Sequence, residues 1–460
     1  MNLDSLLKPK KIVIVGASDS DGFGGAVSKT LESTLSKDEF ENNIFYVNKN
    51  RKVLRGVKCY QDVSEIDSDI DLMVIATNKN TVIDELYKGA KKNVKAAIVY
   101  ASGFSECEDG VELEAELAKV SKELGILVMG PNCAGFCNFV NNIPLFAFLS
   151  EKRDRKGHIG VVSQSGMIAL SMLDNQMMKF SYNISCGNAN IIKFTDYVEF
   201  LINDKDTKII GLYVDAINDI KAFENVISKA KDANKKVVIL KMGRSEISKT
   251  ISKCHTGSAG NISNEDFDDL VKKYDVICSD DLEEFIYTLL ALSYTPQIVN
   301  CKNVASINLS GGEANIMAEM GEKYNINYLN FNEKTKNYLQ ERLPAYAHIT
   351  NPLDMTVSLS YDTEAFADAM DVIMDDENVD YVVIGYTLLR HIDDPCIYYM
   401  IDAIKLLQER RKKNIKPISI VSFFSCSRDD ECVNKLLDLG VVVFPTPMYA
   451  FKILNAIMKK

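Results

Sequence analysis

KIVIVGASDSDGFGG (residues 11–25) is the stretch that decides the fold of the first part of the chain. It runs from a strand-like segment at residues 11–15 directly into a turn rich in glycine and serine, and a helix pattern follows. Continuous apolar runs are typical of parallel strands that are buried on both faces. Glycines after such a strand allow a tight turn, and the free N–H groups of the next helix can hold a phosphate. The stretch therefore predicts a βαβ unit with a phosphate-binding turn.

The alternation of strand-like and helical segments continues through the rest of the sequence. Strands that alternate with helices imply parallel sheets covered by helices. The pattern restarts near Gly160 and again near Val304, and the helical pattern breaks at Thr295-Pro296. We therefore predict an α/β protein with three doubly wound domains in series, Rossmann-like or flavodoxin-like, at residues 1–130, 131–295 and 296–460. The later strand-like runs are residues 44–47, 72–76, 96–100, 127–129, 160–163, 209–214, 236–241, 304–309, 381–386, 418–423 and 441–444.

Composition and charge exclude several classes of function. The 460 residues are 47% hydrophobic and 25% charged, which is ordinary for a globular protein. The net charge of −11 argues against nucleic-acid binding, which requires a surplus of Lys and Arg. Eleven scattered cysteines without a CxxC pair indicate free thiols in a reducing cytoplasm and no zinc site. Without an apolar signal core or a run of about 18 to 20 apolar residues, we expect a cytoplasmic protein with no membrane partner.

His255 is the most informative single residue, because it lies in KCHTGSAG (residues 253–260) and is one of only four histidines. A neutral imidazole is a good nucleophile toward phosphorus and can form a covalent intermediate. The small neighbours would let a phosphate or a whole loop approach closely. The ordinary interpretation of this octapeptide alone is a surface histidine in a loop near a helix start.

The turn after the predicted strand at residues 160–163 is a second candidate. GVVSQSGM (residues 160–167) is a strand, a Ser/Gly turn and a helix start, with Ser165 placed as the N-cap. Exposed amides and the helix dipole would hold an anion there. A nucleophile elbow has the pattern G-x-S-x-G, but here the first glycine is missing and no acid–histidine pair supports Ser165. The pattern favours an anion site over a serine hydrolase.

Other strand ends carry further candidates. The glycine-rich first turn leaves NAD binding and an oxidoreductase as an alternative, although its spacing departs from the GxGxxG fingerprint. The next strand ends in the basic segment Asn48-Lys49-Asn50-Arg51, which suits a phosphate-rich ligand better. The small and apolar residues 133–139 suggest the lining of an organic-acid pocket. Glu199 lies in an amphipathic helix pattern, where a solvated acid is the ordinary interpretation. GPNCAGF (residues 130–136), SCGNA (185–189) and SGGEA (310–314) also follow strands.

Taken in order, these motifs resemble the nucleoside-diphosphate-forming acyl-CoA synthetases of the succinyl-CoA synthetase superfamily, and most closely the α subunit of ADP-forming acetate–CoA ligases. The resemblance covers nearly the whole chain. It rests on VIVGAS (13–18), ASGFSE (101–106), GPNCAGF, VSQSG (162–166), the Glu199 helix, the His255 motif and NPLD (351–354).

The resemblance implies roles for individual residues. His255 would be phosphorylated during turnover, and Glu199 would orient or stabilise it. The first domain would bind CoA through Gly16, Ala17, Ser18, Asp19, Ser20, Asn48, Lys49, Arg51, Ala76, Thr77, Ser102 and Gly103. Phosphate and substrate would lie against Asn132, Ser163, Gln164, Ser165, Gly166, Gly187, Asn188, Gly311 and Gly312, with the turns at Ser163–Gly166 and Gly311-Gly312 cradling the phosphohistidine.

The resemblance also implies a reaction and a partner. The reaction is acid + ATP + CoA ⇌ acyl-CoA + ADP + phosphate, through an acyl phosphate and phosphohistidine. ATP, ADP and Mg would bind an ATP-grasp β subunit, in an α2β2 assembly. The chain departs from the family in Asn48-Lys49-Asn50, where Asn-Pro-Lys is usual, and in Cys254, where Ser or Gly is common. The alternative is a non-catalytic CoA-binding regulatory or scaffold protein.

Overall fold

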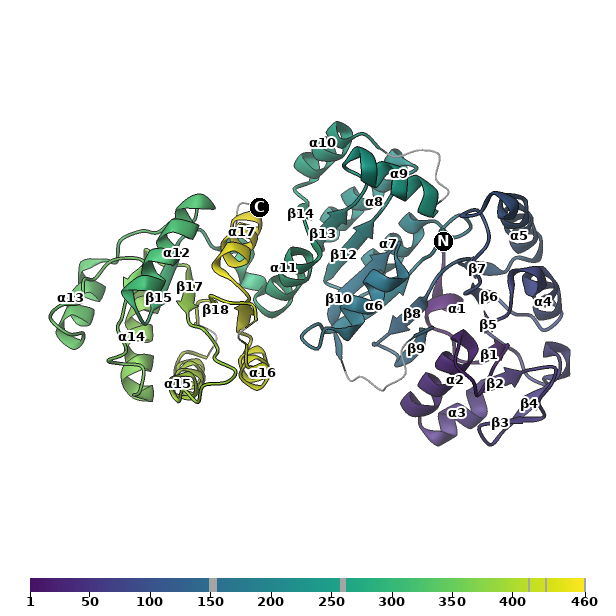
Figure 1. Cartoon of the computed structure of the whole chain (residues 1–460), viewed down its shortest axis with the longest axis horizontal. Helices are drawn as coiled ribbons and strands as arrows, with labels where there is room; N and C mark the ends of the chain where they lie inside the picture. Colours follow the sequence, from purple (N-terminus) through teal and green to yellow (C-terminus); the bar gives the residue numbers. More distant parts are fainter. Residues whose placement is uncertain (149–154, 257–261, 413, 427, 459–460) are drawn as a thin grey trace. The chain divides into compact units, whose positions relative to one another are not determined.

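The chain forms two compact units, Met1–Asp281 and Leu282–Lys460 (Figure 1). The computed structural model describes all residues except 149–154, 257–261, 413, 427 and 459–460, and the side chains of residues 252–256 also lie outside the description. Within the described residues, none of the helices has both the length and the apolar sequence that crossing a bilayer requires.

The first unit begins with a seven-stranded sheet in the order β3-β4-β2-β1-β5-β6-β7. All neighbouring strands are parallel except β3 and β4. The central strand has the sequence IVIV and is buried throughout, as its apolar run predicts. The strands are β1 (Ile12–Val15), β2 (Ile44–Val47), β3 (Val53–Leu54), β4 (Val57–Tyr60), β5 (Leu72–Ile75), β6 (Ala96–Val99) and β7 (Leu127–Met129). The helices are α1 (Asp4–Leu7), α2 (Phe23–Thr34), α3 (Lys37–Asn43), α4 (Val82–Ala90) and α5 (Val111–Leu124).

A second seven-stranded sheet completes this unit, in the order β14-β13-β12-β10-β11-β8-β9. Its strands are parallel apart from β8 and β9, which pair antiparallel with β11 and with each other. The strands are β8 (Gly135–Asn138), β9 (Ile143–Phe146), β10 (Lys156–Ser163), β11 (Phe180–Ser185), β12 (Ile209–Val214), β13 (Lys236–Lys241) and β14 (Ile277–Ser279). The helices are α6 (Gly166–Asp174), α7 (Phe194–Asn203), α8 (Ile220–Asp232), α9 (Glu246–Thr256) and α10 (Asn264–Tyr274).

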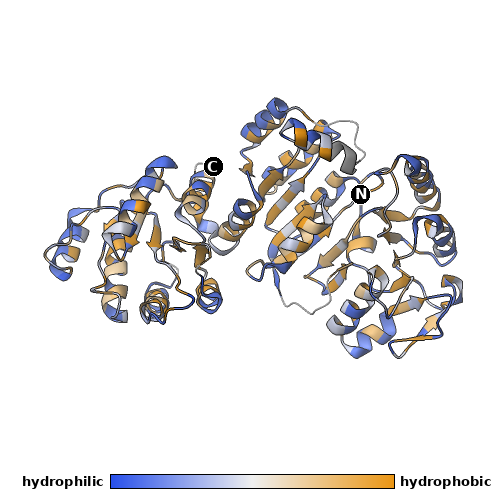
Figure 2. Ribbon diagram, viewed as in Figure 1, coloured by the Kyte–Doolittle hydropathy of each residue, from blue (hydrophilic) through white to orange (hydrophobic). Residues whose placement is uncertain are grey.

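The two sheets of the first unit share a core. One cluster of buried side chains includes Ile14 of β1, Tyr182 of β11 and Leu212 of β12. Hydrogen bonds join the two parts as well: the Tyr100 hydroxyl donates to the Leu145 carbonyl at 3.0 Å, and Asn138 Nδ2 donates to the Leu7 carbonyl at 2.8 Å. Figure 2 shows the strands as largely hydrophobic and the covering helices as mixed, which is the pattern of sheets buried on both faces.

The second unit holds a five-stranded parallel sheet in the order β16-β15-β17-β18-β19. The strands are β15 (Val304–Asn308), β16 (Leu353–Asp354), β17 (Tyr381–Gly385), β18 (Ile418–Val421) and β19 (Val442–Phe444). The helices are α11 (Leu282–Tyr294), α12 (Gly311–Lys323), α13 (Glu333–Arg342), α14 (Thr363–Asp375), α15 (Cys396–Arg411), α16 (Asp430–Asp438) and α17 (Pro447–Met458).

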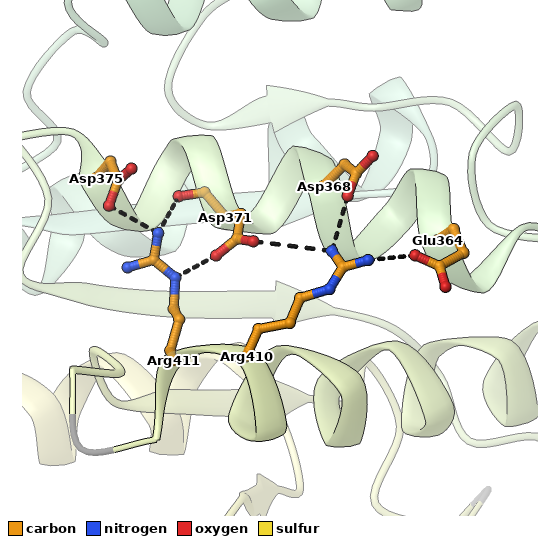
Figure 3. Close-up of polar contacts among 6 residues, drawn as sticks. All are labelled: Glu364, Asp368, Asp371, Asp375, Arg410 and Arg411. Atoms are coloured by element: carbon orange, nitrogen blue, oxygen red, sulfur yellow. Dashed lines mark hydrogen bonds and ion pairs between the residues drawn. The ribbon is translucent and has the colours of Figure 1, made fainter.

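Helices α14 and α15 of this unit are joined by a row of ion pairs (Figure 3). Arg410 Nη1 lies 2.7 Å from Asp368 Oδ1, and its other terminal nitrogen bonds Glu364. Arg411 bonds Asp371, and its Nη2 lies 2.7 Å from Asp375 Oδ1. The acids recur on α14 at helical spacing, so one face of this helix meets both guanidinium groups.

Three sheets dominated by parallel strands confirm the predicted α/β fold class. The compact units divide at Leu282, so α11 is counted with the second unit, while the predicted domain bounds at residues 130 and 295 stay a prediction. One feature of the fold differs from the sequence prediction. The antiparallel hairpin of β8 and β9 was not foreseen, because its short runs contain Gly135 and Pro144 and lack a helix between them.

Candidate functional site

The carboxyl edge of the first sheet gathers the residues predicted to bind CoA. Strand β1 lies between β2 and β5, so its end is the switch point where ligands bind in open α/β sheets. Gly16 has φ +86°, and a Cβ there would lie 2.8 Å from the Ala76 carbonyl oxygen. A Cβ on Gly24 would lie 2.1 Å from the Gly16 carbonyl oxygen. The turn therefore needs glycine at both positions to pack against β5 and the start of α2.

Side chains from β1 and β2 meet at this turn. Asn48 Nδ2 donates to the Ala17 carbonyl at 2.9 Å, which ties the end of β2 to the turn. Arg51 Nη1 lies 3.3 Å from Asp19 Oδ2, so this arginine is already paired with an acid. The Ser18 and Ser20 hydroxyls lie 2.6 Å apart. The exposed Lys49 extends the basic character of the β2 end.

The ends of β5 and β6 complete the same edge. Thr81 Oγ1 donates to Thr77 Oγ1 at 2.8 Å, and the Gly103 amide donates to Glu106 Oε1 at 2.5 Å. Lys79 Nζ donates to the Gly103 carbonyl at 2.9 Å. Ala76 directly follows β5, and Ser102 lies three residues after the end of β6. All twelve predicted CoA-binding residues thus follow four neighbouring strands, and Lys79 is a cation there that the sequence analysis overlooked.

The second sheet presents the predicted anion site at the start of α6. Ser165 is the N-cap, as predicted, and accepts a hydrogen bond from the Ile168 amide at 3.4 Å. The Ser163 hydroxyl donates to the Ser165 carbonyl at 2.7 Å. The first turn of α6 contains no acidic residue. The helix dipole and the free amides at Gly166 therefore face no carboxylate from the helix itself.

Gln164 fixes this turn against the neighbouring strand. Its Oε1 accepts hydrogen bonds from the amides of Asp215 at 2.6 Å and Ala216 at 3.0 Å, and its Nε2 donates to the Ala216 carbonyl at 3.1 Å. These three bonds use the polar atoms of Gln164 to join the ends of β10 and β12. Gln164 therefore holds the turn in place and has little hydrogen-bonding capacity left for a ligand.

Two polar residues that the sequence analysis missed lie at the same edge. Asp215 follows β12 and is only 8% exposed, and Lys241 ends β13 and is 7% exposed. Lys241 Nζ donates to the Asp215 carbonyl at 3.0 Å and also bonds the Met242 carbonyl. Burial lowers the pKa of Lys241 to about 8. Each is a charged residue at the end of an apolar strand, which is the signal that could have identified them.

Asn188 lies in a polar network that joins the two halves of the first unit. Its Nδ2 donates to Glu106 Oε2 at 2.8 Å and to Glu114 Oε2 at 3.0 Å, and its Oδ1 accepts from Asn132 Nδ2 at 3.2 Å. Glu114 is 4% exposed and also accepts from Asn190 at 2.8 Å. Burial alone would raise the pKa of Glu106, but hydrogen bonds from Asn188 and backbone amides outweigh it, so that pKa is lowered.

Glu199 does not lie with these residues. It sits within α7, and its Oε1 is 2.5 Å from Lys229 Nζ. That hydrogen bond is the main cause of the lowered pKa of Glu199. Lys229 is in the last turn of α8, whereas the turn at Gln164 contacts the loop that precedes α8. The structure therefore favours the solvated helix acid over a carboxylate at the anion site.

The His255 backbone lies in α9, the helix that follows β13, while the side chain falls outside the described residues. The predicted lining at residues 133–139 needs correction. Phe136 is fully buried in β8, and the Cys133 thiol donates to the Val99 carbonyl at 3.5 Å. Burial raises the pKa of Cys133 to about 12. These residues form core, because the unforeseen strand β8 carries them into the second sheet.

The second unit has a turn of similar sequence at the start of α12. Ser310 is the N-cap and accepts from the Glu313 amide at 3.3 Å. Glu313 Oε2 accepts in return from the Leu309 amide at 3.1 Å. Asp354 Oδ2 lies 3.2 Å from the position that a Cβ on Gly311 would occupy. Gly311 and Gly312 are thus at a helix start, as predicted, but the carboxyl groups of Glu313 and Asp354 lie beside it.

Comparison with known proteins agrees with this architecture. Residues 10–138 match the CoA binding domain, and residues 156–292 match the succinyl-CoA ligase like flavodoxin domain. The chain is 30% identical to the acetate–CoA ligase (ADP-forming) II subunit alpha of Pyrococcus furiosus, over 83% of this chain and 81% of that one. It is 31% identical to a trans-feruloyl-CoA synthase from an unknown prokaryotic organism, over 83% of this chain and 54% of that protein.

A solved structure has the same fold. The dinucleotide forming acetyl-coenzyme A synthetase 1 of Ca. Korarchaeum cryptofilum, in complex with phosphate and ADP, superposes with a TM-score of 0.84 at 24% identity, over 99% of this chain and 96% of that chain. The fold and domain matches define a protein with CoA-binding and succinyl-CoA-ligase-like domains. The chain belongs to the family of ADP-forming acid–CoA ligases. It spans about half the length of several relatives that carry further sequence, the feruloyl-CoA synthase among them.

Proposed function

We propose that this chain supplies the CoA-binding and phosphoryl-relay parts of an ADP-forming acid–CoA ligase, which catalyses acid + ATP + CoA ⇌ acyl-CoA + ADP + phosphate. One observation carries the proposal: the start of α6, capped by Ser165, has no acid in its first turn and is fixed by Gln164 to the end of β12. A rigid, uncompensated helix N-terminus suits a phosphoryl group in transit.

The first sheet fits CoA on its own geometry. The turn at Gly16 and Gly24 packs so closely against Ala76 and its own backbone that neither glycine has room for a Cβ. Such a glycine turn before a helix is the kind of site whose backbone amides can bind a phosphate. The exposed Lys49 adds positive charge beside it, and Arg51 and Lys79 are two further cations there, each paired with an acid, Asp19 and Asp109. The phosphates of CoA would lie along this edge, with the thiol directed toward the second sheet through the network at Asn188.

The relay proceeds in three balanced steps. In the ATP-forming direction, a phosphate oxygen attacks the thioester carbonyl carbon, and the C–S bond breaks to release CoA thiol and acyl phosphate. An imidazole nitrogen of His255 then attacks phosphorus, and the P–O bond breaks to release the carboxylate. Finally a β-phosphate oxygen of ADP takes the phosphoryl group and frees the imidazole. The α6 N-terminus and the positive charge of Lys241 would stabilise the negative charge that spreads over the phosphoryl oxygens.

The proposal assigns the nucleotide and Mg to an ATP-grasp β subunit. The relative from Pyrococcus furiosus is named a subunit alpha, and the match leaves nearly half of the longer feruloyl-CoA synthase uncovered. The acid at the phosphohistidine would come from Asp215 and not from Glu199, because Asp215 lies at the edge that Gln164 and Lys241 share.

The test is thioester formation by the purified chain with a candidate ATP-grasp subunit, CoA, ATP and a panel of acids. Product is expected only when all components are present, and Gly16→Val should abolish it because a Cβ there meets the Ala76 carbonyl. Gly125→Ala is the matched control, because Gly125 also has positive φ but has no atom within 4 Å of its added Cβ. CoA binding without turnover for any acid would favour the non-catalytic CoA-binding protein.

A further inference from the structure

Helix α9 directs its apolar side chains toward solvent. Ile247 and Ile251 are 77% and 62% exposed, and residues four positions apart lie on the same side of a helix. The least exposed side chains among residues 246–251 are those of the polar Ser248 and Lys249, and they are only half-buried. A surface helix ordinarily places its apolar stripe against the core. The described part of α9 has the opposite arrangement.

The helices that precede and follow α9 have the ordinary arrangement. Phe223 of α8 and Phe267 of α10 are buried in the core that the two sheets of the first unit share. None of the α9 residues with described side chains belongs to that core. The face of α9 formed by Ile247 and Ile251, the Ile247/Ile251 face, is therefore open to solvent in this part of the chain.

Polar contacts hold the start of α9 in place. The Gly243 amide donates to Ser248 Oγ at 2.9 Å, and Lys249 Nζ lies 2.7 Å from Glu246 Oε1. These contacts use neither isoleucine. A change of both isoleucines to polar residues therefore leaves the attachment of the helix intact.

The place of α9 in the proposed reaction identifies the partner. The His255 backbone lies about one helical turn beyond Ile251. In the last step of the relay, the P–N bond at His255 breaks as a β-phosphate oxygen of ADP bonds to phosphorus. Because the proposed function assigns ADP to the ATP-grasp subunit, the end of α9 has to contact that subunit in this step.

The charges of α9 suit contact with a bound nucleotide. Its one acid, Glu246, is paired with Lys249, and Lys253 is a further cation in its sequence. By contrast, α10 has the sequence NEDFDDLVKKY, with four acids and two lysines. Although the chain as a whole has a net charge of −11, α9 carries no uncompensated carboxylate that would repel the phosphates of ADP.

We propose that the Ile247/Ile251 face is a docking surface that packs into an apolar groove of the ATP-grasp subunit, beside its bound ADP. The inference rests on the proposed function and adds to it the contact that holds α9 against the partner. Amphipathic helices bind apolar grooves through side chains that are spaced as these two are. The face acts in phosphoryl transfer to ADP and not in the earlier phosphorylation of His255 by acyl-CoA and phosphate.

The experiment measures these two partial reactions separately in a double variant, Ile247→Gln with Ile251→Gln, which removes the apolar face and keeps good helix formers. The chain is first phosphorylated with an acyl-CoA panel and phosphate, and is then mixed with Mg-ADP and increasing concentrations of the ATP-grasp subunit. ATP formation at subsaturating subunit should fall at least about tenfold, through a higher KM for the subunit, which is the size of effect expected when an interface anchor is lost. Phosphorylation of His255 should remain as in the wild type.

Val111→Gln is the matched control, because it replaces another exposed β-branched residue on a helix of the first unit, and it should leave both partial reactions unchanged. Ile247→Leu with Ile251→Leu keeps an apolar face and should retain the transfer rate. An unchanged transfer rate in the glutamine variant, or an equal loss in both partial reactions, would overturn the inference while the proposed function stands.

If the wild-type chain takes up no phosphate from any acyl-CoA, the proposed function fails, and calorimetry of the chain with the ATP-grasp subunit and Mg-ADP decides the docking surface separately. Binding that the glutamine variant weakens at least about tenfold supports the surface. Equal binding by both chains, or no binding by the wild type, refutes it.

Discussion

The helix starts of α6 and α12 share a Ser-Gly turn and differ in electrostatics. In both, a serine N-cap follows a buried strand, glycine occupies the first helical position, and the N-cap hydroxyl accepts from the third helical amide, Ile168 in one and Glu313 in the other. In α6 that third residue is apolar. In α12 it is an acid, whose carboxylate accepts from the Leu309 amide.

The difference shows that a Ser-Gly turn defines a helix start but not an anion site. At α12 the Glu313 carboxyl group lies at the helix N-terminus and accepts from the Leu309 amide, and the Asp354 carboxyl group lies beside Gly311. At α6 no side chain of the first helical turn carries a negative charge, and Gln164 holds the turn in place through hydrogen bonds to the backbone after β12. The comparison therefore supports our proposal that the phosphoryl group binds primarily at α6.

The largest expected effect comes from giving α6 the charge that α12 has. Ile168→Glu places a carboxylate at the third helical position, where it would compete with the phosphoryl group for the helix N-terminus. A charge in the first turn changes such an interaction by up to about 2 kcal/mol, so phosphorylation by acyl-CoA and phosphate should fall about 30-fold. Stopped-time incorporation of phosphate measures it. Ile168→Gln, with the same shape and no charge, is the control, and an equal loss in both variants would contradict the electrostatic argument.

A somewhat smaller effect is expected from the network that supports the α6 edge. Glu114→Gln replaces a buried carboxylate that accepts from Ser105, Asn188 and Asn190. Loss of charge-assisted bonds in a buried site costs about 1.5 kcal/mol, so KM for CoA should rise about tenfold. Steady-state kinetics over a CoA series show whether KM or kcat changes. The exposed Glu112 on the same helix offers the control Glu112→Gln, and a KM that stays constant in Glu114→Gln would remove the network from the account.

Removing the carboxyl group of Glu313 from α12 should modestly increase the free energy of unfolding, whereas the two preceding changes reduce function. Burial is the main cause of the raised pKa of Glu313, so folding favours its protonated form. The carboxylate consequently reduces stability as pH rises above its unfolded pKa of about 4.3. Glu313→Gln should therefore gain stability relative to the wild type between pH 4 and pH 7, as measured by urea unfolding at each pH. If the difference in the free energy of unfolding between Glu313→Gln and the wild type is constant with pH, the charge of Glu313 does not affect stability at α12.

The smallest effect is expected at the ion pairs between α14 and α15. Arg410→Ala removes contacts to Glu364 and Asp368, which are 69% and 53% exposed. Exposed pairs contribute at most about 1 kcal/mol, so the free energy of unfolding should fall by that amount or less. The phosphorylation rate should not change. If Arg410→Ala instead lowers the phosphorylation rate as much as Ile168→Glu does, the ion pairs of α14 and α15 affect the relay, and the account based on the helix starts is wrong.

The parallel strands could be predicted well from the sequence, because each one is marked by a continuous apolar run within its own segment. The runs at residues 44–47, 127–129, 209–214 and 236–241 coincide with β2, β7, β12 and β13 to the residue. The N-cap at Ser165 was equally local, since the capping hydroxyl and the amide that donates to it are three residues apart. The hairpin of β8 and β9 was missed because its stability comes from pairing with β11, about 45 residues later.

The site was predicted less completely because its decisive contacts join distant segments. Nothing in the helix pattern around Glu199 indicates that its carboxylate forms an ion pair with Lys229. Asp215 and Lys241 become candidates only when β12 and β13 are known to be neighbours in the sheet. The two Ser-Gly turns read alike in sequence, and the position of Asp354 beside Gly311 depends on β15 pairing with β16.

Phosphorylation of His255 is the most direct test of the central claim. Intact-protein mass after incubation with an acyl-CoA panel and phosphate should show one added phosphate that maps to His255 and is lost in acid. His255→Ala should abolish the gain, while His158→Ala, at an exposed position of β10 in the same unit, should retain it. CoA binding with no mass gain from any thioester, with or without the ATP-grasp subunit, would contradict the relay and identify the chain as a CoA-binding protein without this chemistry.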